Sequence, residues 1–274
     1  MNPSRRLGVC LLAVGLAVFF GRAAADDRPV SPLRQAHAHN DYEHPRPLFD
    51  ALAQGFCSVE ADIYLVDGQI LVAHNRPDVK PERTLEKLYL DPLRARAKAN
   101  NGQIYPAGPP FWLLIDAKTE AKSTYAALHP VLERYADILS VTTDGRSERK
   151  AISVVISGNT ARDAIKAQTR RYAAIDGRPP DLDTDAPAHL VPWVSESWTK
   201  LFKWTGDGPM PAPERAKLRD FVGKAHQQGR LVRFWATPEK PAFWQELHDA
   251  GVDLINTDKL AELRKFLLAA RESK

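Results

Sequence analysis

The sequence alternates short apolar segments with longer segments of helical periodicity, and this alternation constrains the fold more than any other feature. A short apolar run bounded by turn residues is typical of a buried strand, and apolar residues three and four apart are typical of an amphipathic helix. Strands are expected at Gln35–His37, Ser58–Tyr64, Ile70–Ala73, Phe111–Asp116, Ala151–Ser157, Tyr172–Asp176, Leu190–Val194, Leu231–Trp235 and Asp253–Asn256. Helices are expected at Pro47–Gln54, Leu85–Ala97, Tyr125–Tyr135, Glu214–Gln228, Lys240–Ala250 and Lys259–Ala270.

Strands that are apolar along most of their length and alternate with helices predict a parallel sheet covered by helices. About eight such units in about 250 residues favour a closed barrel over an open, doubly wound sheet. No G-x-G-x-x-G follows the first expected strand, which counts against a dinucleotide-binding fold. We therefore expect the α/β class, as a single-domain (β/α)8 TIM barrel. The segment 176–208 is rich in Pro, Gly and Asp and is predicted to be a loop on the barrel rim.

The N-terminus has the features of a secretory signal peptide. They are the charged pair Arg5 and Arg6, the apolar run Leu7–Phe20 and the small residues Ala23–Ala25. A charged start, a short apolar core and an A-x-A-like site define such a leader, and the run is shorter than the roughly 20 residues of a membrane-spanning helix. We expect residues 1–25 to be removed and residues 26–274 to be exported to the periplasm or the medium. An uncleaved membrane anchor is the alternative.

The charge of the precursor gives no support to a nucleic-acid partner. The formal net charge of +4 includes Arg5, Arg6 and Arg22 of the expected leader, which contains no acid. The chain without its leader is therefore nearly neutral, whereas a nucleic-acid-binding domain carries a clear basic excess.

Two carboxylates lie inside an apolar strand. Glu60 and Asp62 are two residues apart in the expected strand Ser58–Tyr64, so both side chains point to the same face. Unpaired carboxylates inside a barrel would be costly, and a cation would offset that cost. Asp116 ends another apolar strand, at the edge where barrel active sites are built. Carboxylate oxygens suit a hard divalent cation, Mg²⁺ or Ca²⁺. The alternative is that Glu60 and Asp62 face outward and meet Lys or Arg on a helix.

Three histidines lie at expected strand ends. His37 and His39 end the first strand, and His74 follows the strand Ile70–Ala73. The H-x-H pair is also found in metal-dependent hydrolases of the amidohydrolase or PHP type. Those sites need further histidine ligands at later strand ends. The later histidines mostly lie in helix or loop patterns: His129, His189, His226 and His248.

The order His…Glu-x-Asp…Asp-Gly…His resembles the phosphatidylinositol-phospholipase-C-like phosphodiesterase superfamily, and within it the glycerophosphodiester phosphodiesterase type. The segments HAHNDYEHPRPLFDAL, SVEADIYLVDGQILVAH, RTLEKLYLDPL and FWLLIDAKT are similar to the branch typified by altered inheritance of mitochondria protein 6. The resemblance resumes at VRFWATPEKPAFWQELHDAGVDLINTD, the family's closing strand–helix–strand. It covers most of the chain after residue 25 and implies a phosphoric diester hydrolase.

The resemblance implies roles for individual residues. Glu60, Asp62 and Asp116 match the metal-binding acids, and His74 matches the second catalytic histidine. His37 and His39 both stand where the family has the histidine of His-Arg-Gly; His37 is favoured because it follows the strand directly. The substrate pocket of relatives is matched by Lys118, Trp235 and Asn256. The chain lacks the family's His-Arg-Gly arginine and its E-N-T segment, which puts phosphate binding, and glycerol specificity in particular, in question.

The implied reaction is hydrolysis of a small phosphodiester or phospholipid-derived substrate. One divalent cation, Mg²⁺ or Ca²⁺, would neutralise the phosphoryl oxygens, while one histidine takes a proton and the other protonates the leaving alkoxide. A hydroxyl of the substrate itself could be the attacking group, giving a cyclic phosphate first. Contact of Trp193, Trp198 and Trp204 with an apolar substrate or a lipid, and so with a membrane surface, is one interpretation, and burial of these rings in the core or an interface is the other. A non-catalytic exported binding barrel remains the second alternative.

Overall fold

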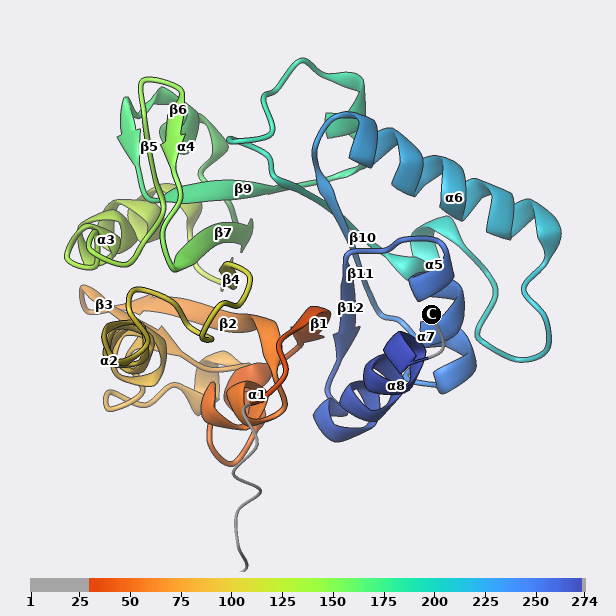
Figure 1. The fold of residues 1–274 in the computed structure, drawn as a ribbon. Coiled ribbons are helices and arrows are strands. Elements are labelled where there is room, and N and C mark those ends of the chain that lie inside the picture. Colours follow the sequence, from red (N-terminus) through yellow and green to blue (C-terminus); the bar gives the residue numbers. More distant parts are fainter. Residues whose placement is uncertain (1–29, 273–274) are drawn as a thin grey trace, which may run out of the picture.

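Eight parallel strands close into a barrel in the structure, a computed structural model that describes residues 30–272. The strands are β1 (Leu33–Ala38), β2 (Phe56–Val66), β4 (Phe111–Ala117), β7 (Ile152–Gly158), β9 (Ala173–Gly177), β10 (Trp193–Ser197), β11 (Leu231–Trp235) and β12 (Leu254–Thr257). Strand β1 pairs with both β2 and β12, which closes the sheet (Figure 1). The expected TIM barrel is confirmed. The expected signal peptide, residues 1–25, lies outside the described residues.

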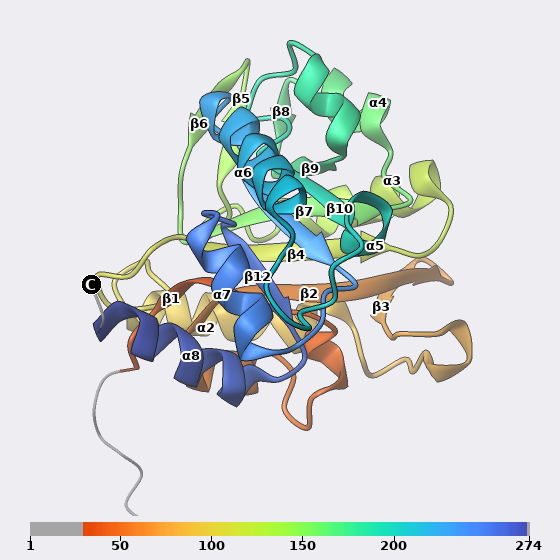
Figure 2. The same ribbon diagram turned by 90° about the vertical axis from the view of Figure 1, so that its right-hand side faces the viewer.

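Helices cover the outside of the barrel (Figures 1 and 2). They are α1 (Phe49–Ala53), α2 (Asp91–Ala99), α3 (Ala121–Glu133), α4 (Arg162–Ala167), α5 (Trp198–Leu201), α6 (Ala212–Gln227), α7 (Pro241–Asp249) and α8 (Leu260–Glu272). A π-helical turn, η3 (Glu86–Leu90), precedes α2, and short 3-10 turns form η1 (Asp41–Glu43), η2 (Arg76–Asp78) and η4 (Pro179–Asp183). Each long helix buries one stripe against the strands, as Leu218, Val222 and Ala225 do in α6. Within residues 30–272, no helix has the length and apolarity to cross a bilayer.

A hairpin extends the barrel wall beside β2. Strand β3 (Gln69–Val72) pairs antiparallel with β2, with Val66 opposite Gln69. The two connecting residues, Asp67 and Gly68, both have positive φ, which matches the twist of a tight hairpin. The hairpin brings His74, just after β3, back to the C-terminal end of the barrel strands.

The segment 176–208 is not the loop that its composition predicts. It contains β10 and α5 as well as η4. The strand expected at Leu190–Val194 starts later, at Trp193, because Pro192 has no N–H for the sheet hydrogen bonds. Three short strands were also not expected: β5 (Val141–Thr143), β6 (Arg146–Glu148) and β8 (Arg170–Arg171), which pair as a separate small sheet.

The tryptophans of this region belong to the interior. Trp193 is fully buried inside the barrel with Leu114, Val155 and Leu254. Trp198 and Trp204 are 1% and 7% exposed and pack between barrel and helices. The interpretation that these three rings contact an apolar substrate or a lipid at the rim is therefore wrong, because all three are buried by the rest of the fold.

Candidate metal and phosphate site

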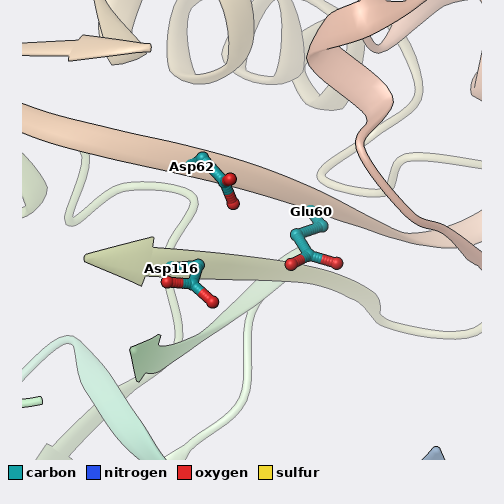
Figure 3. A group of neighbouring side chains, drawn as sticks. All are labelled: Glu60, Asp62 and Asp116. Atoms are coloured by element: carbon teal, nitrogen blue, oxygen red, sulfur yellow. The ribbon is translucent and has the colours of Figure 1, made fainter. Parts of the chain in front are cut away.

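Three carboxylates converge at the C-terminal end of the barrel. Glu60 and Asp62 lie on β2 and Asp116 on β4, with Asp62 directly opposite Asp116 in the parallel register. All three point toward the space inside the barrel between the two strands (Figure 3). One oxygen from each lies within 4.8 Å of the others. The sheet alternation that places apolar residues 59, 61 and 63 against the helices places Glu60 and Asp62 inside, so the outward-facing alternative does not hold.

Two cationic side chains neutralise the cluster in part. Lys118 Nζ lies 3.0 Å from Asp62 Oδ2 and 3.1 Å from Asp116 Oδ1. The guanidinium of Arg233, on β11, donates to Glu60 Oε2 at 2.7 Å. Burial acts to raise the pKa of Glu60, but the charge of Arg233 and the hydrogen bond from His37 together outweigh it and hold the pKa below its ordinary value. Burial and then the charge of Glu60 raise the pKa of Asp62 to about 6.

The donor set fits a hard divalent cation. Ca²⁺ and Mg²⁺ bind carboxylate oxygens at about 2.0–2.6 Å, so ligand oxygens on opposite sides of the ion are about 4–5 Å apart. The three carboxylates have this spacing. Asp62 Oδ1 is buried and has no hydrogen-bond partner within the described residues. A buried carboxylate oxygen without a partner is costly, and a bound cation would satisfy it.

His37, on β1, is completely buried. It lies deeper in the barrel than the opening at the C-terminal ends of the strands, which we call the mouth. Its Nδ1 lies 2.7 Å from Ser58 Oγ and its Nε2 lies 3.4 Å from Glu60 Oε2. In the tautomer with hydrogen on Nε2, the ring accepts from Ser58 and donates to Glu60. Burial, followed by the charge of Arg233, lowers the pKa of His37 to about 4. Both ring nitrogens are therefore engaged with the protein, in a neutral ring away from solvent.

His39 and His74 lie at the accessible mouth. His39 Nδ1 lies 2.9 Å from Asp258 Oδ1, in the arrangement by which a carboxylate orients an imidazole and leaves Nε2 free to accept a proton. Burial acts to lower the pKa of His39, but the hydrogen bond to Asp258 and the charge of Glu60 raise it overall. The side chain of His74 is 49% exposed. Its Nδ1 lies 3.0 Å from the Tyr42 hydroxyl, which in turn lies 2.6 Å from Asp62 Oδ2.

The three residues matched to the substrate pocket occupy different positions around the cluster. Lys118 bridges Asp62 and Asp116 as described above. Asn256 is buried and accepts from Arg233 Nε at 2.9 Å, so it holds that guanidinium in place. Trp235 ends β11, and its ring lies 5.0 Å from the guanidinium carbon of Arg178.

Arg178 is a further cation at the mouth that the sequence did not single out. It follows β9 and its Nη1 donates to Asp176 Oδ2 at 2.8 Å. Asp176 is buried and also accepts from Ser157 and Ser195 on the two neighbouring strands. These contacts fix the guanidinium while the arginine side chain stays 35% exposed.

The later histidines lie elsewhere in the structure. His129, His226 and His248 are on the outer helices α3, α6 and α7, and His189 precedes β10 on the opposite side of the barrel from the carboxylates. None belongs to the cluster of possible ligands found in residues 30–272. The geometry therefore does not support the amidohydrolase alternative.

Comparison with known proteins shows the family of this chain. Residues 26–176, more than half of the chain, match the family model described as "AIM6-like phosphodiesterase domain". This chain belongs to that family. Residues 232–261, which carry Arg233, Trp235 and Asn256, match a second model, the glycerophosphoryl diester phosphodiesterase family.

Curated relatives of this AIM6-like chain include fungal proteins. Altered inheritance of mitochondria protein 6 of Eremothecium gossypii is 29% identical over 275 residues, covering 87% of this chain and 71% of the relative. The protein of the same name in Saccharomyces cerevisiae is 28% identical, covering 85% and 70%. Among solved structures, a glycerophosphodiester phosphodiesterase from Parabacteroides distasonis superposes with a TM-score of 0.52 at 15% identity, covering 88% of this chain and 99% of that one. This likeness shows the shared fold.

Two further residues of the candidate site were missed from the sequence. Asp258 follows β12 directly and pairs with His39. Arg233 interrupts the apolar strand Leu231–Trp235 just as Glu60 and Asp62 interrupt β2. The argument that singled out the carboxylates, a charge inside an apolar strand, could have found Arg233 as well.

Proposed function

We propose that this chain hydrolyses a small phosphodiester or phospholipid-derived substrate with one divalent cation, Mg²⁺ or Ca²⁺, at the C-terminal mouth of the barrel. The observation that carries the proposal is the convergence of Glu60, Asp62 and Asp116 within 4.8 Å, with Asp62 Oδ1 lacking a partner within residues 30–272. The mouth also presents the two ingredients that phosphodiester hydrolysis needs beside a cation. These are imidazoles for proton transfer and positive charge for the phosphate.

The cation, when bound, would neutralise phosphoryl oxygens and the charge that develops on them. Lys118 and Arg178 are the side chains of this chain that would orient the phosphate. Lys118 is placed by its contacts to Asp62 and Asp116, and Arg178 by its contacts to Asp176 and Trp235. A guanidinium can bind two phosphate oxygens at once. Arg178 would thus supply the charge that the absent His-Arg-Gly arginine supplies in relatives.

We assign proton transfer to His39 and His74, which are both accessible. Asp258 holds His39 with Nε2 free, so that nitrogen would take the proton from the attacking water or substrate hydroxyl. His74 is oriented through Nδ1 by Tyr42, so its Nε2 would protonate the leaving alkoxide. His37 would then have a supporting role, since its hydrogen bond and that of Arg233 hold Glu60 in its ionised form. The sequence favoured His37 as the first catalytic histidine; its complete burial favours His39.

The proposed substrate class is based on the comparisons with known proteins. The second matching family is described as a glycerophosphoryl diester phosphodiesterase family, and the Parabacteroides protein of similar fold is named a glycerophosphodiester phosphodiesterase. We propose a glycerophosphodiester substrate for the present chain as well.

The test is metal-dependent turnover with matched carboxylate variants. Hydrolysis of bis-p-nitrophenyl phosphate and of a glycerophosphodiester should stop after chelation and return when Mg²⁺ or Ca²⁺ is added. Glu60→Gln, Asp62→Asn and Asp116→Asn should each weaken metal binding in calorimetry and reduce kcat/KM by about 10²-fold or more, the order expected when charge stabilisation of several kcal/mol is lost. Asp50→Asn is the control, because Asp50 lies on α1 and pairs with Arg46.

Full turnover in a preparation shown by elemental analysis to be metal-free would refute the proposal. So would carboxylate variants that keep wild-type activity while the control behaves normally.

A further inference from the structure

A pocket lies at the end of the barrel opposite the carboxylate cluster. It has a volume of about 590 Å³ and is lined by residues near the starts of the strands, such as Gln35 of β1, Trp112 of β4 and Leu254 of β12. Val141, Thr142 and Arg171 of the small β5–β6–β8 sheet form part of its wall. The buried cluster of Leu114, Val155, Trp193 and Leu254 fills the barrel between this pocket and the carboxylates. The volume is in the range of small-molecule sites.

Arg171 is the most unusual residue of this pocket. It is only 5% exposed, yet no ion pair with a carboxylate is found for it among the described residues. Its guanidinium donates to His189 Nδ1 at 2.6 Å, and its Nε is buried without a hydrogen-bond partner. A buried cation without a counter-charge is costly. The guanidinium also donates to the backbone carbonyl of His189 at 3.3 Å. Neither the imidazole nor this carbonyl carries a full negative charge, so the protein residues around Arg171 offset the cost only in part.

Two further arginines stand at the rim. Arg34 and Arg149 are exposed, line the pocket, and form no ion pair within residues 30–272. The acid in the lining is Asp253, whose Oδ2 already contacts His226 Nε2 at 2.8 Å and accepts from Val232 N at 2.9 Å. The pocket therefore carries an excess of positive charge.

The remaining wall combines apolar and neutral polar residues. Trp112 is partly exposed and rests on Trp193, with ring centroids 5.3 Å apart. Tyr172, Val154 and several prolines and alanines form the apolar part of the lining, which also contains Ser140, Ser147 and Ser153. A ligand that matches this pocket has an anionic group for the arginines and a flat apolar body for the tryptophan.

We propose that this pocket binds a small organic anion, a carboxylate or a phosphomonoester, whose charged group pairs with Arg171 and whose apolar body packs against Trp112. The site is separate from the carboxylate cluster and does not depend on the function proposed for that cluster.

The experiment follows Trp112 directly. The protein is labelled with 5-fluorotryptophan, Trp112→Phe identifies the ¹⁹F resonance of Trp112, and EDTA is present to keep metal from the carboxylates. The probes are 1-naphthyl phosphate, 1-naphthoate and the neutral 1-naphthalenemethanol. Both anions should shift the Trp112 resonance in a saturable manner, and the neutral probe should bind at least about tenfold more weakly, because a charge-assisted hydrogen bond is lost. Comparison of the two anions distinguishes a phosphate site from a carboxylate site.

Variants locate the binding. Arg171→Met should weaken both anions by about tenfold or more. Since loss of a buried arginine can impair folding, the exposed pair Arg34→Gln and Arg149→Gln is tested together as a second variant and should weaken binding several-fold. Lys118→Met is the matched control, because it removes a cation from the opposite mouth and should leave the titration unchanged.

Four results would overturn the proposal. They are an unchanged Trp112 resonance with both anions, equal affinity for the neutral probe, unchanged affinity in the folded arginine variants, and loss of binding in Lys118→Met.

Discussion

Asp41 should make the stability of this protein depend on pH. Its side chain lies in η1, just after β1, and is completely buried. One carboxylate oxygen accepts from Leu48 N at 2.5 Å and from the Tyr89 hydroxyl at 2.8 Å, while the other has no partner within residues 30–272. Burial raises the pKa of Asp41 to about 7, against the effect of these two hydrogen bonds. No cationic side chain is among the contacts that hold it.

The sign and size follow from the pKa difference. The folded state binds this proton more tightly than the unfolded chain, whose aspartate has the ordinary value of 3.8. The contribution of Asp41 to stability is therefore complete below about pH 4 and is lost as the pH rises through 7. A difference of about 3 pKa units at about 1.4 kcal/mol each corresponds to about 4 kcal/mol in total. Of this, about 2–3 kcal/mol should be lost between pH 5 and pH 8.

Asp41→Asn should remove this pH dependence. The amide oxygen of the introduced Asn can still accept from Leu48 and Tyr89, and the side chain stays neutral at every pH. Its NH₂ group is buried without a hydrogen-bond acceptor, which costs about 1–3 kcal/mol at every pH. The assay is urea unfolding of wild type and variant at intervals from pH 5 to pH 8. Other titrating groups are common to both proteins, so the difference between the two curves isolates Asp41.

From pH 5 to pH 8, the free energy of unfolding of Asp41→Asn should rise by about 2–3 kcal/mol relative to that of the wild type. Tyr89→Phe is the informative control, since loss of the hydroxyl donor should extend the pH dependence to higher pH. A constant difference between wild type and Asp41→Asn from pH 5 to pH 8 would refute the reasoning.

Two further predictions concern the histidines and the leader. His39→Ala and His74→Ala should each lower kcat by about 10²-fold or more with metal affinity unchanged, whereas His37→Ala should weaken metal binding through Glu60. Metal titration and turnover of bis-p-nitrophenyl phosphate by the three variants check this. A loss of turnover confined to His37→Ala would contradict the assignment. Material exported to the periplasm or medium should begin at Asp26 in mass spectrometry, and an intact Met1 on exported protein would exclude cleavage after Ala25.

The barrel could be predicted from the sequence because each of its strands contains a run of apolar residues that must be buried on both faces. The prediction was least accurate where polar residues replace apolar ones within a strand. Strand β10 continues through Ser195, Glu196 and Ser197, which are all buried, and Ser195 donates to Asp176. The apolar pattern ends before the strand does, so the strand was placed too early. The small β5–β6–β8 sheet was missed because strands of two or three residues, many of them polar, give no periodic signal.

The carboxylates of the site could be found from the sequence because an acid within an apolar strand is costly and therefore conspicuous. Arg178 and Asp258 could not, because a charged residue just after a strand looks like ordinary loop surface. Their contacts to Asp176 and His39 depend on which strands are neighbours in space. That information appears only when the barrel is closed.

The buried arginines show that the two ends of the barrel differ in charge and would bind ligands of opposite charge. Arg233 is 3% exposed and neutralised by Glu60. Arg230 is 2% exposed and donates to two backbone carbonyls, those of Asp181 and Ala186. Arg171 shares with Arg230 a buried Nε that lacks a partner in the described part of the chain, but unlike Arg230 it faces an open pocket. At the mouth that holds the carboxylates, the protein supplies the negative charge, and the proposed cation would complete the balance. At the opposite mouth the protein supplies the positive charge, and the proposed anion would supply the counter-charge.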